Sequence, residues 1–365
     1  MALTQGNGGM NSRERMLAAI NHEPVDRIPT DIWATNEVFA KLRNYFGEKA
    51  DLLAELHIDG FANIWTGPKY IGPMLPQVSL DETVDFWGMR WRRVPHEGGA
   101  YNEQSFFPLA EARTIDDIRA YPWPNADWFD YSGMRAEALE GRKTKAVQCG
   151  YMAPFYFHNL LRGLEQSLVD PLLEPEVTHY LVGRISDFFY DQHRRMFEAC
   201  DGLIDVAQVT DDLGSQTGPL ISMEVYREFY ASHHKRFIDL CHEFGIKVFH
   251  HDDGGCRPFL SLLVEMGIDI LNPVQWLCPG MDMRELKAEF GGRVCFHGAI
   301  ENQRILPFGT PEEVRAEVRH CIDSLASDGT GYILAPCHNL QVVTPVENIV
   351  AMYDEAWKYG SMNPR

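Results

Sequence analysis

His251 and Asp253 are the two side chains whose types and spacing most directly suggest chemistry. They stand two positions apart at the end of the apolar segment IKVFHHDDGG, and in extended chain residues i and i+2 point the same way. An imidazole and a carboxylate could therefore meet on one cation, with Cys337 supplying a sulfur from the end of a later apolar segment. Zinc accepts all three ligand types, and catalytic zinc usually keeps three protein ligands and an open position. A hydrogen-bonded His–Asp pair beside a packed cysteine remains the alternative interpretation.

Further polar and aromatic side chains follow other apolar segments. Asp211 and Asp212 are adjacent, so their side chains point apart and only one can face a pocket, as a general base or a hydrogen-bond acceptor for substrate. N-capping of a short turn is the other interpretation of this pair. His338 could donate a proton or orient a substrate. Candidate substrate-binding residues are Trp33, Asn36, Tyr156, Gln216, Trp276 and Asn339, although core packing is the commoner role of such aromatic residues.

Eight apolar, β-branched segments precede these residues and are predicted strands. They span residues 27–32, 58–64, 145–150, 203–209, 246–251, 268–273, 293–297 and 331–335. Helical periodicity separates most of them, and such alternation predicts parallel strands with right-handed crossovers. We therefore expect an α/β fold of the (β/α)8 TIM-barrel type, whose active site lies at the carboxyl ends of the strands. An open doubly wound sheet is the rival, but its Gly-rich turn, GxGxxG, is missing after the first segment.

Composition and charge exclude several classes of function. The chain has 365 residues, 45% of them hydrophobic, and a formal charge of -19. That charge disfavours binding to nucleic acids and anionic lipid, and no apolar run approaches the roughly 18 residues of a membrane span. The eight cysteines are scattered without a CxxC pair, which predicts a reducing cytoplasm.

The chain is predicted to form one domain with two irregular parts. Residues 1–10 are polar and Gly-rich, so we expect a flexible tail there and a single domain over residues 11–365. Residues 65–125 interrupt the alternation of strands and helices with many Pro, Gly and Trp residues. A segment inside them, WGMRWRRV, has the pattern of a β-ribbon. We expect this insertion to lie over the barrel mouth, where it could act as a lid.

Five long segments together resemble one known family. They are SRERMLAAINHEPVDRIPTDI (12–32), DDLGSQTGPLISMEVYREFY (211–230), VFHHDDGGCRPFLSLLVEMGIDILNPVQ (248–275), FHGAIENQRILPFGTPEEV (296–314) and GYILAPCHNLQVVTPVENIVAMYDEA (331–356). The chain resembles the uroporphyrinogen decarboxylase superfamily over nearly its whole length. Within it, the chain is most similar to the branch of methylcobamide:coenzyme M methyltransferases. The resemblance implies a (β/α)8 barrel, in agreement with the strand count.

The same resemblance separates two activities. Porphyrinogen decarboxylases carry an early RQAGR segment that grips substrate carboxylates, but the matching stretch here, IWATNEVF (32–39), has no arginine. They also carry an aspartate after the second strand, and the matching stretch ANIWTGPKY (62–70) has no acid. His338 does match the histidine of the decarboxylases' GHG-like turn. We therefore expect that a porphyrinogen is not the substrate.

The methyltransferase branch implies a zinc site. Its members bind zinc through a His-x-Cys motif after the fifth strand and a cysteine after the eighth, and His251 and Cys337 match these positions. Asp253 stands where the first cysteine would be, and Gln275 where an acidic residue sometimes supplies a further ligand. A carboxylate in place of a thiolate makes the ligand set harder and leaves the identity of the metal open.

The resemblance favours a zinc-dependent methyltransferase that moves a methyl group between a small-molecule substrate and a corrinoid protein. Asp211 or Asp212 and His338 would manage the proton. A separate partner would carry the corrinoid, because this chain has no DxHxxG motif, and a homodimer is implied by the resemblance alone. One alternative is a metal-independent decarboxylase or lyase acting on a small carboxylic acid. Another is a small-molecule binding barrel without turnover.

Overall fold

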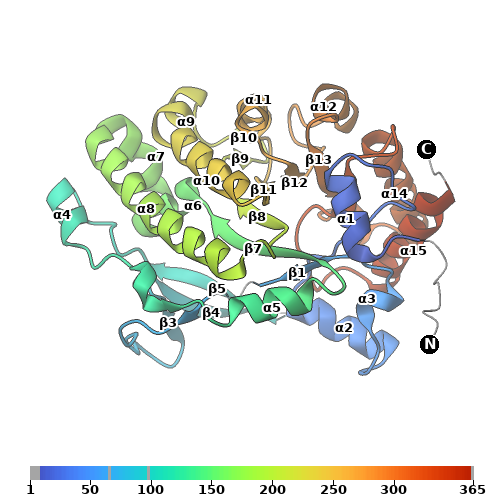
Figure 1. Cartoon of the computed structure of the whole chain (residues 1–365), viewed down its shortest axis with the longest axis horizontal. Coiled ribbons are helices and arrows are strands. Elements are labelled where there is room, and N and C mark those ends of the chain that lie inside the picture. The colour runs from blue at the N-terminus through green and yellow to red at the C-terminus, as the bar shows by residue number, and fades with distance from the viewer. Residues whose placement is uncertain (1–8, 65–66, 97–98, 363–365) are drawn as a thin grey trace.

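The computed structural model describes residues 9–64, 67–96 and 99–362. The chain is an α/β protein built on a curled parallel sheet of seven strands in the order β1-β7-β8-β11-β12-β13-β14 (Figure 1). These strands are β1 (Phe61–Asn63), β7 (Ala146–Met152), β8 (Val206–Val209), β11 (Lys247–His251), β12 (Ile270–Asn272), β13 (Cys295–Ile300) and β14 (Tyr332–Pro336). Five of them, β7, β8, β12, β13 and β14, are buried along almost their whole length, as expected of parallel strands covered on both faces.

Helices connect the strands and surround the sheet. Those of the first half are α1 (Ser12–Ile20), α2 (Asn36–Phe46), α3 (Leu52–Glu55), α4 (Ile115–Ala120), α5 (Met134–Gly141), α6 (Pro154–Arg162), α7 (Leu164–Leu173) and α8 (Pro175–Cys200). Those of the second half are α9 (Met223–Phe229), α10 (Ala231–Glu243), α11 (Arg257–Met266), α12 (Met283–Phe290), α13 (Ile305–Phe308), α14 (Pro311–Leu325) and α15 (Val346–Met362). Within the described residues, no helix is both long enough and apolar enough to cross a membrane.

Seven of the eight predicted strands are strands of the sheet, and the first, residues 27–32, is not. It forms a single isolated bridge, between Thr30 and Leu334. Pro29 has no N–H to donate, and the N–H of Thr30 donates to the Asp59 carboxylate instead of to a strand. The segment nevertheless contacts both edges of the sheet, because Leu334 O accepts from Asp31 N and Thr30 O accepts from Gly60 N, just before β1. This arrangement is consistent with a TIM-barrel-like fold.

The predicted insertion contains several short strands. They are β2 (Lys69–Tyr70), β3 (Glu82–Val84), β4 (Arg90–His96) and β5 (Gly99–Phe106), of which β3, β4 and β5 form an antiparallel sheet. The partner of β2 is β6 (Phe129–Asp130), which lies beyond the predicted insertion. The ribbon predicted from WGMRWRRV is thus present. Trp87 anchors the segment to α8, with ring centroids 4.9 Å from Phe188 and 5.7 Å from Phe189. The position of the insertion over the barrel mouth and its closure as a lid stay predictions, as do the boundaries of the single domain. The predicted tail, residues 1–10, lies outside the described residues except for Gly9 and Met10.

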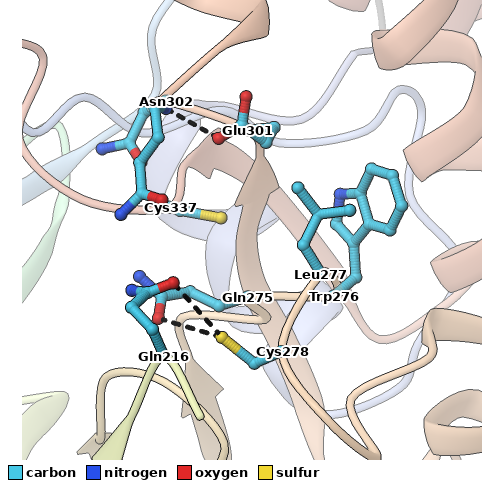
Figure 2. Close-up of a pocket in the computed structure, with 9 residues that line it drawn as sticks. Gln216, Gln275, Trp276, Leu277, Cys278, Glu301, Asn302 and Cys337 are labelled. Carbon is cyan, nitrogen blue, oxygen red and sulfur yellow. Dashed lines mark hydrogen bonds between the residues drawn. The ribbon is translucent and has the colours of Figure 1, made fainter.

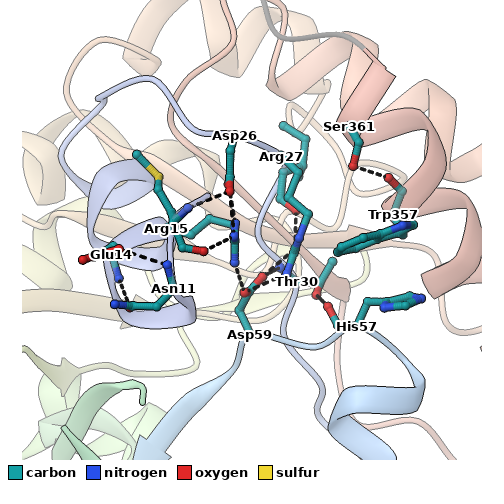
Figure 3. Close-up of polar contacts among 12 residues, drawn as sticks. Asn11, Glu14, Arg15, Asp26, Arg27, Thr30, His57, Asp59, Trp357 and Ser361 are labelled. Atoms are coloured by element: carbon teal, nitrogen blue, oxygen red, sulfur yellow. Dashed lines mark hydrogen bonds and ion pairs between the residues drawn. The ribbon is translucent and has the colours of Figure 1, made fainter. Parts of the chain in front are cut away.

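A cluster of ion pairs lies at the amino ends of the strands (Figure 3). Asp59 directly precedes the turn into β1 and is fully buried. Its carboxylate accepts from Arg15 at 2.6 Å and from both terminal nitrogens of Arg27 at 2.7 and 2.9 Å. Arg15 also pairs with Asp26 at 2.6 Å, and hydrogen bonds from this guanidinium hold the pKa of Asp26 below its usual value. The cluster therefore joins α1 to the start of the sheet through ion pairs shared by two arginines and two aspartates.

Candidate metal centre

Three side chains meet at the carboxyl ends of β11 and β14. His251 is the last residue of β11, Asp253 follows it by two positions, and His338 lies two residues beyond β14. One nitrogen or oxygen atom from each lies within 4.8 Å of the others, and they form the only such group of three found in the described parts of the chain. Asp253 lies between the imidazoles, with Oδ1 3.9 Å from His251 Nε2 and Oδ2 3.7 Å from His338 Nε2. The arrangement offers two nitrogen atoms and one carboxylate to a cation.

A fourth side chain, Asp212, borders this cluster. Its Oδ1 lies 3.6 Å from His251 Nε2. Burial raises the pKa of Asp212 to about 7, with the neighbouring carboxylates adding to the rise and His251 opposing it. Burial also lowers the pKa of His338, so that this imidazole is neutral and keeps a lone pair at neutral pH.

The residues present fit a divalent cation. Asp212 Oδ1 and Asp253 Oδ1 are both buried and accept no hydrogen bond from any described residue. A buried carboxylate oxygen without a donor is costly, and a bound cation would remove that cost. Nitrogen and oxygen ligands suit zinc among other divalent metals.

The structure brings His251 and Asp253 together, as their spacing predicted, but the third group of the cluster is His338 and not Cys337. The Cys337 thiol lies 3.4 Å from the carbonyl oxygen of Val274, and burial raises its pKa well above the usual value. Gln275, the other predicted ligand, uses its side-chain oxygen to accept from the N–H of Gly254. Neither side chain is part of the cluster.

Cys337 and Gln275 instead line a neighbouring pocket (Figure 2). Its other walls are Gln216, Trp276, Leu277, Cys278, Glu301, Asn302 and Gln303. The Glu301 carboxylate is occupied, because it accepts the backbone N–H groups of Gln303, Arg304 and Ile305 at 2.7 Å each. The described lining therefore presents amides, thiols and one indole, without a lysine or arginine.

The two adjacent aspartates face different surroundings. Asp211 is 1% exposed and accepts the N–H groups of Phe155 and Tyr156 in the first turn of α6 at 3.1 and 2.7 Å. It also lies 2.8 Å from His234 Nε2. Asp211 is therefore held by the start of a helix, and only Asp212 reaches the cluster.

The predicted substrate-binding residues are distributed around this rim. The Trp33 ring lies 5.4 Å from the ring of His251 and 6.2 Å from that of His338. Gln216 and Trp276 line the pocket of Figure 2. Tyr156 lies in the first turn of α6, and its ring centroid is 6.3 Å from that of Tyr151 in β7. Asn36 is the first residue of α2, and Asn339 directly follows His338. Their roles in binding stay predictions.

Two glycines set the spacing of the loops that carry the carboxylates. Gly214 lies so close to the carbonyl oxygen of Asp253 that a side chain there would collide with it, and a Cβ on Gly254 would lie 2.5 Å from the carbonyl oxygen of Ser215. Gly254 also has φ +83°, a conformation that favours glycine. The loops after β8 and β11 therefore touch backbone to backbone.

Sequence reasoning missed the partners of His251 on its far side. His251 Nδ1 lies 2.6 Å from the side-chain oxygen of Asn272, and the Asn272 amide nitrogen lies 2.7 Å from His297 Nδ1. Both partners lie at the carboxyl ends of predicted strands, which was the available signal, but neither was given a role.

The sequence is similar to one protein family and to two curated proteins. The family model described as uroporphyrinogen decarboxylase (URO-D) matches residues 113–359. A methylated-thiol–coenzyme M methyltransferase of Methanosarcina mazei is 27% identical over 203 residues, 54% of this chain and 49% of the relative. A uroporphyrinogen decarboxylase of Dechloromonas aromatica is 22% identical over 188 residues, 47% of this chain and 49% of the relative. The chain thus matches about half the length of each of these curated relatives.

A solved structure extends the likeness to the whole fold. It is a methyltransferase from Methanosarcina mazei, with a TM-score of 0.67 and 16% identity, and the match covers 96% of this chain and 99% of that one. At this identity the likeness establishes the architecture only.

Proposed function

The chain belongs to the uroporphyrinogen decarboxylase (URO-D) family, and from that premise we propose that it is a zinc-dependent methyltransferase. It would move a methyl group between a small-molecule substrate and a corrinoid carried by a partner protein. The observation that carries this proposal is the cluster of His251, Asp253 and His338 at the carboxyl ends of the strands. The methylated-thiol–coenzyme M methyltransferase among the relatives supports the same reaction class.

His251, Asp253 and His338 would hold the metal. When bound, zinc would act as a Lewis acid that stabilises the anion of a substrate heteroatom. The ligand set holds no thiolate, so an oxygen or nitrogen substrate is expected as readily as a thiol.

Asp212 would manage the proton of the substrate. Its carboxylate lies beside His251 and keeps a buried oxygen without a donor among the described residues, so it would be placed to accept that proton. Asp211 would not take this role, because the N-terminus of α6 and His234 occupy its oxygens. Trp33 would shield the site from water, since its ring lies beside both imidazoles.

The pocket next to the cluster supports a small substrate over a porphyrinogen. A porphyrinogen carries several carboxylates, and the described lining offers them Glu301 and no cationic side chain. Glutamine amides, thiols and an indole suit a compact, weakly charged molecule better.

Metal content of the purified protein tests the proposal. We expect one metal ion per chain in the wild type and loss of that ion in His251→Ala. His242→Ala is the matched control, because His242 is half-exposed and bonds to Asp269 outside the cluster. Equal, sub-stoichiometric metal in wild type and His251→Ala would contradict the proposal.

Activity after removal of the metal separates the two enzymatic candidates. Methylcobalamin can replace the corrinoid partner, with a panel of thiols, alcohols and amines as acceptors. Exhaustive chelation should abolish methyl transfer, and added zinc should restore it. Undiminished turnover of a small carboxylic acid after chelation would instead favour a metal-independent decarboxylase or lyase.

A further inference from the structure

Behind the metal cluster, a chain of hydrogen bonds runs from His251 into the interior of the sheet. His251 Nδ1 bonds to Asn272 Oδ1 at 2.6 Å, and Asn272 Nδ2 bonds to His297 Nδ1 at 2.7 Å. His297 Nε2 then bonds to Asp31 Oδ2 at 3.1 Å. Asn272 and His297 are fully buried, and Asp31 is 5% exposed. Four side chains from four separate segments of the chain thus form one continuous line.

The aspartate at the inner end fixes the direction of every bond in this line. The Asp31 carboxylate can only accept, so His297 Nε2 carries the proton and, in the neutral ring, Nδ1 accepts. The Asn272 amide must therefore donate to His297 through its nitrogen and present its oxygen to His251. His251 then donates from Nδ1, so Nε2 is the nitrogen that points toward Asp253 and Asp212. In the metal-free protein a proton on Nε2 or on a facing carboxylate separates these acceptors, and a bound cation would take its place.

The reverse orientation of the amide is unfavourable. If Asn272 turned its oxygen to His297, Nδ1 of that ring would need a proton. In a neutral ring, Nε2 would then face the Asp31 carboxylate with a lone pair, which is repulsive in a buried site. Trp33 holds the same carboxylate oxygen in place through a hydrogen bond from Nε1 at 3.2 Å. The inner anion therefore selects one amide orientation.

We propose that Asp31, His297 and Asn272 are positioning residues that hold His251 in its Nδ1–H tautomer and so keep Nε2 available as a metal ligand. The use of Nε2 as a ligand rests on the proposed function, whereas the proton on Nδ1 is a property of the metal-free protein. A partner on the second ring nitrogen orients a ligating histidine and raises its basicity, and losing such a partner costs roughly 10- to 100-fold in metal affinity.

The tautomer can be read directly in metal-free protein. In a sample labelled with 15N in its histidines, the ring-nitrogen shifts distinguish protonated from unprotonated atoms, and the signals missing from His251→Ala identify His251. We expect Nδ1 of His251 and Nε2 of His297 to carry the protons in the wild type. A wild-type His251 whose Nδ1 is unprotonated, or protonated in only part of the molecules, would overturn the proposal.

Two substitutions of Asn272 then test the link to the metal. Asn272→Leu removes the acceptor and should lower zinc affinity by roughly 10- to 100-fold in chelator competition. Asn272→Asp keeps an acceptor for Nδ1–H and should keep affinity near the wild-type value. A purely structural role does not predict this rescue, because the substitution places an additional carboxylate in a fully buried position.

Asn348→Leu is the matched control. Asn348 is 1% exposed, and its amide donates to Leu306 O and Gly309 O away from the site. It should lose stability without a change in zinc affinity or in the His251 signals. Unchanged affinity in folded Asn272→Leu would overturn the proposal while leaving the metal site intact. A wild type that binds no metal but shows the expected tautomer would overturn the proposed function alone.

Discussion

The two ends of the sheet carry charge clusters of opposite kinds. At the amino ends, Asp59 accepts hydrogen bonds from two arginines and a backbone N–H, and the pKa of nearby Asp26 is lowered. At the carboxyl ends, Asp212 and Asp253 each keep a buried oxygen without a donor, and the pKa of Asp212 is raised. A carboxylate whose oxygens accept hydrogen bonds stabilises the fold, whereas a carboxylate with a buried oxygen that lacks a donor can still bind a cation. This division matches the architecture, in which the carboxyl ends of the strands carry the active site and the amino ends contribute to stability.

Removing Asp59 should cause the largest loss of stability. Asp59→Ala leaves Arg15 and Arg27 buried without their shared anion, and breaking a buried ion pair from one side costs about 3–5 kcal/mol. We expect that decrease in the free energy of unfolding in urea, with zinc affinity unchanged in the folded protein. Asp187→Ala removes an exposed partner of Arg236 and should cost about 0–1 kcal/mol. If both variants lost the same stability, the amino-terminal cluster would not be the stabilising one.

His338 and Cys337 distinguish the structural ligand set from the one expected by resemblance. His338→Ala should lower zinc affinity by more than the roughly 100-fold that the loss of an outer partner costs. Cys337→Ala should leave affinity near the wild-type value, because its thiol faces Val274. Chelator competition on both variants measures the difference. The reverse order would restore Cys337 as the ligand and remove His338 from the centre.

The smallest effect is a change in the pH dependence of stability at the carboxyl-terminal cluster. Because the pKa of Asp212 is raised to about 7 in the folded metal-free protein, the stability of the folded state falls as pH rises from about 4 to about 7 and is level above that. Asp212→Asn removes this loss, so its stability relative to the wild type should grow over the same window. The Asp212 carboxylate is 38% exposed, so we expect about 1 kcal/mol or less.

Urea unfolding of both metal-free proteins at pH 5 and pH 8 measures this difference. Asp211→Asn provides the contrast, because it weakens the hydrogen bonds to the first turn of α6 and should destabilise the protein at both pH values. An Asp212→Asn protein that is less stable than wild type at pH 8 would show that the Asp212 carboxylate stabilises the fold, as that of Asp59 does.

More of the fold than of the candidate site could be predicted from the sequence. Seven of the predicted strands are present because strands buried on both faces are marked by nearly continuous apolar runs. The segment at residues 27–32 has the same pattern, but Pro29 and the Asp59 carboxylate remove its ladder hydrogen bonds. That contact joins residues far apart in the sequence, so local pattern could not reveal it.

The site was harder to predict, because the sequence does not show which of two neighbouring side chains faces it. Neighbouring residues in an extended chain face opposite sides, so the sequence predicts that one of Asp211 and Asp212 faces the pocket but not which one. The same alternation after β14 directs Cys337 to Val274 and His338 to the cluster. The Asn272 amide adds a further choice, because its orientation depends on Asp31 in another segment.

The backbone contact between the loops after β8 and β11 limits how this centre can be redesigned. Gly214 lies against the backbone of Asp253 and Gly254 against that of Ser215, so a methyl group at either position would push the two loops apart. The gap between Asp212 and Asp253 is therefore a fixed dimension of the scaffold. A protein engineer who wants another metal here would have to exchange donor atoms at constant spacing, because cavity size is not an adjustable variable.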